Sequence, residues 1–271
     1  MRISLVWASS AIATLLLGIG SDSRAQGVPE HLLTAADSLY FVDGDPALAL
    51  EVLGPVISQI GEAPASTSAH AELLYEALWR AARASATLGL FSERRRAHEE
   101  WYDRAEVYAR RAAELDPART EGPYWIIVSQ GRRALRAGAL KASSLAEAVR
   151  RGAHEILARD PSHAGAHDAL GRLYLEVLTL PRIHRILARL LAGRAAVAEA
   201  TWEAAESHLR QAVELAPDVV IYRVDLARLH VAQQDWAAAS EDLEAAQSLP
   251  IVTPADTVFQ REASRLARRV P

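Results

Sequence analysis

A short amphipathic segment that ends at proline recurs along the chain, and this recurrence constrains the fold more than any other feature. It is clearest in AEVYARRAAELDP, ending at Pro117, and in AESHLRQAVELAP, ending at Pro217. AVRRGAHEILARDP, ending at Pro161, is a weaker copy, and WAAASEDLEAAQSLP reaches Pro250 one residue short. Small residues along one stripe allow a neighbouring helix to approach closely, and proline ends the helical hydrogen bonding. The pattern predicts a stack of paired helices.

A partner helix precedes each clear copy. HDALGRLYLEV and RVDLARLHVAQ both place a large residue before a small one, with a ring three residues further on. The matching residues are Leu170, Gly171 and Tyr174 in the first, and Leu226, Ala227 and His230 in the second. These features resemble tetratricopeptide repeats, which are helix-turn-helix units of 34 residues. We therefore expect an all-α fold in which such repeats form a right-handed superhelix.

The repeats divide the chain into expected helix pairs at 30–61, 70–117, 118–161, 162–217 and 218–250. The first pair contains an Asp43-Gly44-Asp45 turn, and a Pro/Ser/Thr linker at 62–69 follows it. A last helix is expected to start at Thr253, capped by its hydroxyl with Pro254 in the first turn, and to end near Arg269. It would cover the exposed face of the last repeat. The expected domains are 1–25, 26–69 and 70–271.

Residues 1–25 have the pattern of a secretory signal peptide. Arg2 precedes an apolar stretch from about Leu5 to Gly20, and Ser23-Arg24-Ala25 supplies small residues for cleavage. We expect cleavage after Ala25 and a periplasmic or secreted protein, with an uncleaved N-terminal anchor as the alternative. The chain has no Cys, which excludes disulfides, zinc thiolates and a thiolate nucleophile. A net charge of −4 argues against nucleic acid as a partner.

The order of several segments resembles the regulator of microtubule dynamics family over roughly residues 70–269. They include ELLYEALWRAARA, GPYWIIVSQGRRAL, ILARDPSHAGAHDALGRLYLEVLTLP and LRQAVELAPDVVIYRVDLARLHV. An insertion after Leu180 falls where that family has one. The resemblance implies a repeat domain that holds a phospholipid. Its eukaryotic members are associated with microtubules or membrane contacts, and an exported chain would not meet microtubules.

Catalytic signatures are missing from the sequence. It contains no Gly-rich phosphate loop after a strand, no Gly-x-Ser-x-Gly and no His-Glu-x-x-His, so we expect a non-enzymatic protein without a cofactor. The rival is a metal-binding or hydrolytic protein using His163 and His167, which are four residues apart and near Asp160 and Asp168. The alternative roles are a helix start for His163 and packing for His167. The charged run 93–100 indicates a solvated face with local ion pairs.

The insertion at about 181–194 is a predicted basic amphipathic helix. Its apolar residues Ile183, Ile186, Leu187, Leu190 and Leu191 share one stripe, with Arg182, Arg185 and Arg189 mostly off it. Such a helix can lie on an anionic membrane, roof a groove of the same molecule or thicken the repeat's core.

The concave face is the candidate binding groove. By register, the first helices of the pairs present Arg80, Ala84, Ile126, Gln130, Arg133, Arg172, Leu175, Val224, Arg228 and Val231. Aliphatic residues alternating with arginines suit an amphipathic anionic ligand such as a phospholipid, or an acidic or C-terminal peptide. Alternatively, some of these arginines pair only with Asp168, Asp225 or Glu176. The predicted function is a module that binds a partner protein or such a ligand in this groove.

Overall fold

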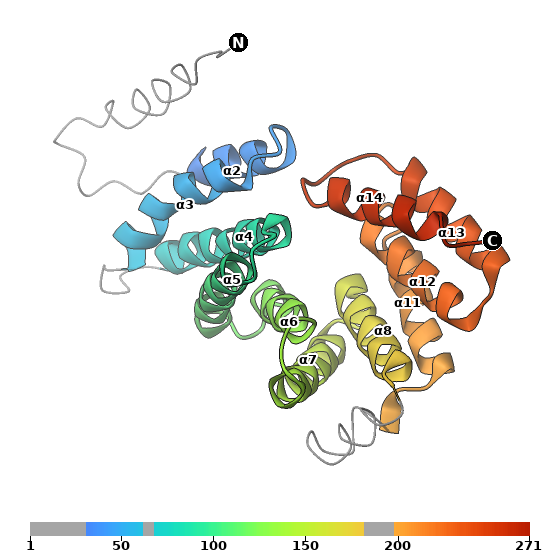
Figure 1. Cartoon of the computed structure of the whole chain (residues 1–271). Coiled ribbons are helices and arrows are strands. Elements are labelled where there is room, and N and C mark those ends of the chain that lie inside the picture. Colours follow the sequence, from blue (N-terminus) through green and yellow to red (C-terminus); the bar gives the residue numbers. More distant parts are fainter. Residues whose placement is uncertain (1–30, 62–67, 182–197) are drawn as a thin grey trace, which may run out of the picture.

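The computed structural model describes residues 31–61, 68–181 and 198–271 (Figure 1). The regular elements within these ranges are α-helices. They are α2 (His31–Phe41), α3 (Pro46–Gly61), α4 (Ser68–Phe91), α5 (Arg95–Leu115), α6 (Glu121–Ala134), α7 (Ala139–Arg159), α8 (Ala164–Thr179), α11 (Trp202–Leu215), α12 (Val220–Gln233), α13 (Trp236–Ser248) and α14 (Asp256–Ala267).

The helices pack as pairs, and the pairs stack into a curved array (Figure 1). α4 packs on α5, α6 on α7, α8 on α11 and α12 on α13. The first helices of successive pairs also touch, since α4 contacts α6, α6 contacts α8 and α8 contacts α12. The pair formed by α2 and α3 precedes this series and packs on α4. The expected all-α superhelix of helix pairs is confirmed.

The prolines end the helices as predicted. α5, α7 and α11 finish at Leu115, Arg159 and Leu215, two residues before their prolines. In each case the backbone N–H of the capping residue still donates to a carbonyl of the last turn, for example Asp116 to Ala112. The chain then turns because proline has no N–H to donate and its ring obstructs a preceding helical turn.

The small residues on these helices lie at helix contacts. Ala109, Ala112 and Ala212 are completely buried, as is Leu209 of α11. Gly171 of α8 faces Leu209 so closely that a Cβ atom on the glycine would lie 2.6 Å from the Leu209 Cγ atom. The predicted alternation of large and small residues therefore sets how closely α8 and α11 approach.

Asp43-Gly44-Asp45 forms the expected turn between α2 and α3. Gly44 has a φ of +67°, in the left-handed region that glycine enters without a steric penalty. The Asp45 Oδ1 atom then accepts hydrogen bonds from the backbone N–H groups of Ala47 and Leu48, at 3.0 Å each. Pro46 occupies the first helical position, where its missing N–H costs nothing.

Two predicted boundaries are wrong. α14 begins at Asp256 rather than just after Thr253, because the Asp256 carboxylate accepts hydrogen bonds from the backbone N–H groups of Val252 and Thr253 and folds the chain into a turn there. α4 begins at Ser68, so the end of the expected 62–69 linker is helical. The role predicted for the last helix is confirmed, since Phe259 and Ala263 pack on α12 and α13.

Part of the charged run 93–100 is solvated as expected. Arg96 donates to Glu100 at 2.8 Å, and both side chains are exposed. His98 departs from this pattern because it is buried against Tyr102, with the ring centroids 4.6 Å apart. Burial and the nearby Arg136 and Arg132 charges lower the pKa of His98 to about 4.

The array curves far enough for its first and last repeats to meet (Figure 1). Leu90 near the end of α4 packs against the apolar cluster of α12, α13 and α14. The Arg132 guanidinium of α6 lies over the Phe259 ring of α14, 5.4 Å from its centroid.

No helix in the described ranges has both the length and the apolar character needed to cross a bilayer.

Candidate functional site

The predicted groove arginines are all ion-paired. Arg80 contacts Asp37 at 2.9 Å and also Glu76. Arg133 contacts Glu106 at 2.6 Å and Asp103 at 2.8 Å.

Arg172 and Arg228 share the buried carboxylate of Asp225, and each has a second acidic partner, Glu176 and Glu262 respectively. The structure thus contains the pairing of Arg172 with Asp225 and Glu176 that was the alternative to ligand binding.

Asp225 is the centre of this ion-pair network. Its side chain is 5% exposed. Burial opposes its ionisation, but the guanidinium groups of Arg172 and Arg228 prevail and lower the pKa of Asp225 below its ordinary value. The two arginines come from α8 and α12, so the carboxylate joins the first helices of two successive repeats.

Asp168 lies on α8 near this network, and its pKa is shifted in the direction opposite to that of Asp225. Its Oδ1 atom is shielded from solvent and has no hydrogen-bond partner among the described residues. Burial, followed by the negative charge of Asp225, raises the pKa of Asp168 well above its ordinary value. Asp168 therefore has a buried oxygen atom without a hydrogen-bond partner among the described residues.

The uncharged groove residues are less open than the sequence suggests. Leu175 and Val224 belong to core clusters, with exposed fractions of 4% and 0%. Gln130 is buried and donates to Glu106 at 2.9 Å. Ile126 and Val231 are half-buried.

The histidine pair on α8 is engaged in local hydrogen bonds. His163 caps the helix, since its Nδ1 atom accepts from the Ala166 N–H at 3.1 Å. The His167 Nδ1 atom lies 2.9 Å from Nδ1 of His208, and its Nε2 atom lies 3.0 Å from the Pro161 carbonyl oxygen. Nowhere in the described ranges do three His, Asp or Glu side chains gather in a way that could hold a metal ion.

Two predicted features lie outside the described residues. One is the amphipathic insertion, with Arg182, Ile183, Arg185, Ile186, Leu187, Arg189, Leu190 and Leu191. The other is the segment 1–25.

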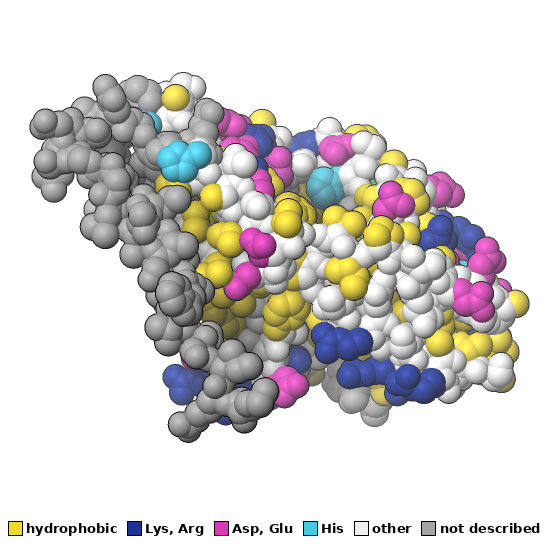
Figure 2. Space-filling model, turned by 90° about the horizontal axis from the view of Figure 1, so that it is seen from above, with side chains coloured by type: hydrophobic (Ala, Val, Ile, Leu, Met, Phe, Trp, Pro, Cys, Tyr) yellow, Lys and Arg dark blue, Asp and Glu magenta, His cyan; other side chains and the backbone are white. Residues whose placement is uncertain are grey.

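Figure 2 shows one face of the molecule, where acidic side chains are scattered among apolar ones and basic side chains gather toward one edge.

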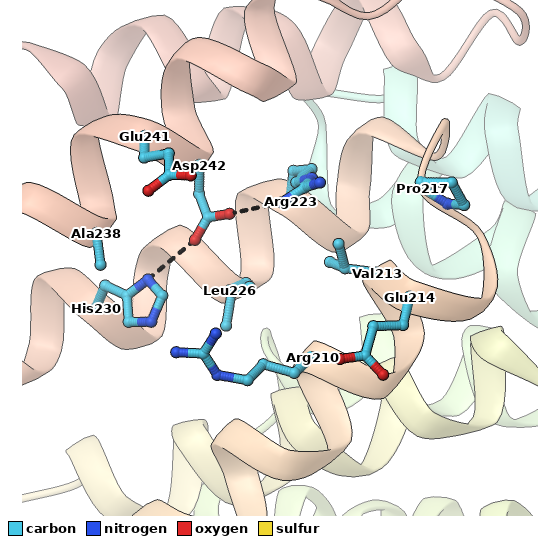
Figure 3. Close-up of a pocket in the computed structure, with 10 residues that line it drawn as sticks. All are labelled: Arg210, Val213, Glu214, Pro217, Arg223, Leu226, His230, Ala238, Glu241 and Asp242. Carbon is cyan, nitrogen blue, oxygen red and sulfur yellow. Dashed lines mark hydrogen bonds and ion pairs between the residues drawn. The ribbon is translucent and has the colours of Figure 1, made fainter.

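A pocket of about 400 Å³ between α11, α12 and α13 was missed by the sequence reasoning. Figure 3 shows His230 of α12 with Nδ1 directed at Asp242 of α13, and Arg223 approaching the same carboxylate. The Nδ1 atom lies 2.9 Å from Asp242 Oδ2, and Arg223 Nη1 lies 3.1 Å from Oδ1. The sequence pattern indicated only a packing ring at His230, because its partner is twelve residues away on the next helix.

Comparisons with known proteins agree with the fold. The profile of the family described as Regulator of microtubule dynamics protein 1-3 matches residues 64–270. A thermophilic TPR protein of Thermus thermophilus has a similar structure, with a TM-score of 0.55 and 18% sequence identity over 87% of this chain and 97% of that one. No curated protein matches the chain.

A second similarity is to the APC/C hetero-tetramer Cut9-Hcn1, with 15% identity over 94% of this chain and 59% of that one. Its TM-score of 0.21 is too low to support a structural argument. The family profile spans most of the chain, including every helix from α4 to α14. The repeat architecture, the helix contacts and the profile therefore agree, and this chain belongs to the Regulator of microtubule dynamics protein 1-3 family.

Proposed function

We propose that this chain is a non-enzymatic binding module whose concave groove takes a segment of a partner polypeptide. The observation that carries the proposal is that the predicted groove arginines have carboxylate partners, whereas a nearby arginine does not. The predicted arginines are neutralised by carboxylates, whereas Arg132 has no hydrogen bond or ion pair within the described residues and lies over Phe259. The charge of Arg132 acts on Asp168, whose Oδ1 atom also lacks a partner among those residues.

A polypeptide segment matches this arrangement better than a phospholipid. Its backbone alternates N–H donors and C=O acceptors, so it can satisfy the unpartnered oxygen of Asp168 in either protonation state as well as the donors of Arg132. A lipid phosphate offers acceptors only and would have to compete with Asp225, Glu106 and Glu76 for their arginines. Binding of a phospholipid instead of a peptide is therefore the result that would contradict this proposal.

The same geometry supports a function without catalysis. A hydrolytic role for His163 and His167 would require a ring nitrogen directed at a substrate. His163 instead caps α8, and both nitrogens of His167 approach protein atoms within 3.0 Å.

The test uses a peptide selected from a random displayed library against the purified protein. Its Kd would be measured by calorimetry for wild type, for Arg132→Glu and for the control Arg96→Glu. We expect Arg132→Glu to weaken binding at least tenfold, since it reverses the charge beside Asp168. Arg96→Glu should have no effect, because that side chain is 92% exposed and its one ion pair among the described residues is with Glu100.

Native mass spectrometry of the same preparations can detect a bound phospholipid, which is the result that would contradict the peptide proposal. A phospholipid retained at one per chain by wild type and lost from Arg132→Glu, with no selectable peptide, would replace the peptide proposal by the lipid one.

We also propose, from the pattern of residues 1–25, that the module is exported. N-terminal sequencing of protein purified from its host should then begin at Gln26. A mature chain that starts at Met1 would contradict cleavage and favour an N-terminal anchor.

A further inference from the structure

The last helix carries a row of exposed arginines. Arg261, Arg265, Arg268 and Arg269 are all exposed, and none of them forms an ion pair within the described residues. Arg261 has one hydrogen bond there, which it donates to the Thr257 carbonyl oxygen at 2.9 Å. Because an α-helix turns about once every 3.6 residues, the four positions share one side of α14 and of the turn that follows it. We call these four residues the arginine row.

The other side of α14 is buried, and the acidic residues of the helix are engaged elsewhere. Phe259 and Ala263 pack in the apolar cluster that α14 shares with α12 and α13. The Asp256 carboxylate accepts two backbone N–H groups of the preceding turn, and Glu262 pairs with Arg228 of α12. Neither carboxylate of α14 therefore has an ion pair with the arginine row.

The spacing of the arginine row lowers the stability of its own helix. Arg261 and Arg265 are four residues apart, as are Arg265 and Arg269, and like charges at that spacing repel each other. On α5 the exposed Arg96 instead has a partner four residues on, Glu100, at 2.8 Å. The helix dipole favours positive charge only in the last turn, which does not include Arg261. A local arrangement that opposes folding is expected at functional sites.

We propose that the arginine row is a docking surface for an acidic segment of a partner polypeptide. A guanidinium can bind a carboxylate through two parallel N–H···O bonds. Residues four apart in a helix are separated by about 6 Å along its axis. Alternate residues of an extended chain are about 6.7 Å apart. Carboxylates at every second position of an extended segment therefore match the spacing of Arg261, Arg265 and Arg269.

A polypeptide fits this surface better than a membrane does. A helix that lies on a bilayer buries an apolar face that adjoins its basic one. Among the residues of α14, all of which the structure describes, no large hydrophobic side chain is exposed, because the apolar face is covered by α12 and α13. Ile251 and Val252 are exposed in the loop before α14, so an anionic membrane is the occupant to test against.

The direct test is a titration of the full-length protein at low ionic strength, followed by fluorescence anisotropy. The probe is a labelled, blocked peptide of alternating Glu and Ser, and the control peptide has Gln in place of Glu. We expect saturable binding of the Glu peptide, a Kd at least tenfold higher for the Gln peptide, and weaker binding as salt is added. Equal affinities, or no saturable binding of the Glu peptide, would overturn the proposal.

Two triple variants separate the arginine row from the net charge of the chain. Arg261→Glu, Arg265→Glu and Arg269→Glu together should weaken binding of the Glu peptide at least tenfold. The control variant reverses three exposed arginines elsewhere that also lack an ion pair in the described ranges: Arg94, Arg104 and Arg151. It changes the net charge by the same amount and should leave the Kd within twofold. Equal weakening by both variants would show a general charge effect and refute the proposal.

Arg261→Glu alone gives a signature that a structural role would not give. The substitution replaces a repulsive pair by an attractive one, because it places a carboxylate four residues before Arg265. The thermal unfolding midpoint should therefore rise while the Glu peptide binds more weakly. A lower midpoint would show that Arg261 stabilises the fold, and the inference from repulsion would fail.

Vesicles of equal parts phosphatidylcholine and phosphatidylserine test the membrane. Co-sedimentation that is lost in the triple variant of the arginine row, without binding of the Glu peptide, would overturn the proposal in favour of a lipid surface. The arginine row lies outside the groove, so this proposal does not rest on the function proposed above. Arg132→Glu, which tests the groove, should leave the Glu-peptide titration unchanged, so failure of one proposal can be distinguished from failure of the other.

Discussion

The close approach of α8 and α11 at Gly171 allows a quantitative test of how this array is held together. A Cβ atom at position 171 would meet Leu209 Cγ at 2.6 Å, Leu209 Cδ2 at 2.9 Å and the Ala205 carbonyl oxygen at 3.0 Å. Replacing glycine by alanine inside a helix favours the helix by about 1 kcal/mol. Overpacking of a close contact costs about 1–3 kcal/mol. We therefore expect Gly171→Ala to lower the free energy of unfolding by up to ~2 kcal/mol.

A double-mutant cycle isolates the cause. Leu209→Ala alone should cost about 2–5 kcal/mol, because it opens a cavity at a completely buried position. In that background the two Leu209 atoms nearest the new methyl group are gone and only the Ala205 carbonyl oxygen remains close, at 3.0 Å, so Gly171→Ala should destabilise the fold less than it does in wild type, or stabilise it. The coupling free energy should then reach about 1 kcal/mol or more.

The assay is urea unfolding followed by circular dichroism. Gly131→Ala is the matched control, because a Cβ atom there would have its nearest neighbour, Val149 Cγ2, at 3.9 Å, and we expect stabilisation of about 1 kcal/mol. If Gly171→Ala destabilises equally in both backgrounds, the contact between α8 and α11 is not what requires glycine, and the packing argument fails.

Three further predictions concern the charged groups. The lowered pKa of Asp225 means that its ion pairs stabilise the fold above the unfolded value of about 3.9, and this contribution is lost as the pH falls through the folded pKa. The unfolding midpoints of wild type and Asp225→Asn should therefore differ at pH 7 and converge in acid; a constant difference would contradict the ion-pair account. Because the pKa of His98 is lowered to about 4, wild type should lose stability as the pH falls from about 6.5 toward that value. His98→Phe should remove that slope, and an unchanged slope would assign it to another group. Asp37→Ala removes the acceptor that Arg80 and Arg83 contact at 2.9 and 2.6 Å, so hydrogen exchange should accelerate in α2 while α12 stays unchanged.

The sequence was sufficient to predict the helix pairs because their signals are local. Each of the repeat prolines follows an amphipathic segment and marks its end, although another proline, Pro55, lies inside α3, and a stripe of alanines marks a contact face whatever the neighbour is. The start of α14 was not predictable from the same signals. The Asp256 carboxylate binds two amides that precede it, and this turn competes with the cap that Thr253 would have provided.

The candidate sites were harder to predict because the residues that contact one another there are distant in sequence. The register placed Arg80 and Arg172 on inner helices, but it could not show that Arg80 meets Asp37, or that Arg172 and Arg228 share one carboxylate. The pocket at His230 takes its lining from three helices, so no single segment carries its signature.

The contacts of Leu90 and Arg132 with the last helix change how the molecule is expected to come apart. In an open array each repeat touches only its neighbours, and unfolding begins by fraying at either end. Here α14 packs on α12 and α13 and is also approached by Arg132 of α6, while Leu90 of α4 touches the cluster that α14 completes. Loss of α14 would therefore loosen repeats that lie far from it along the chain. We therefore expect the last helix to couple the unfolding of repeats that are distant along the chain, rather than to leave each repeat to unfold with its neighbours alone.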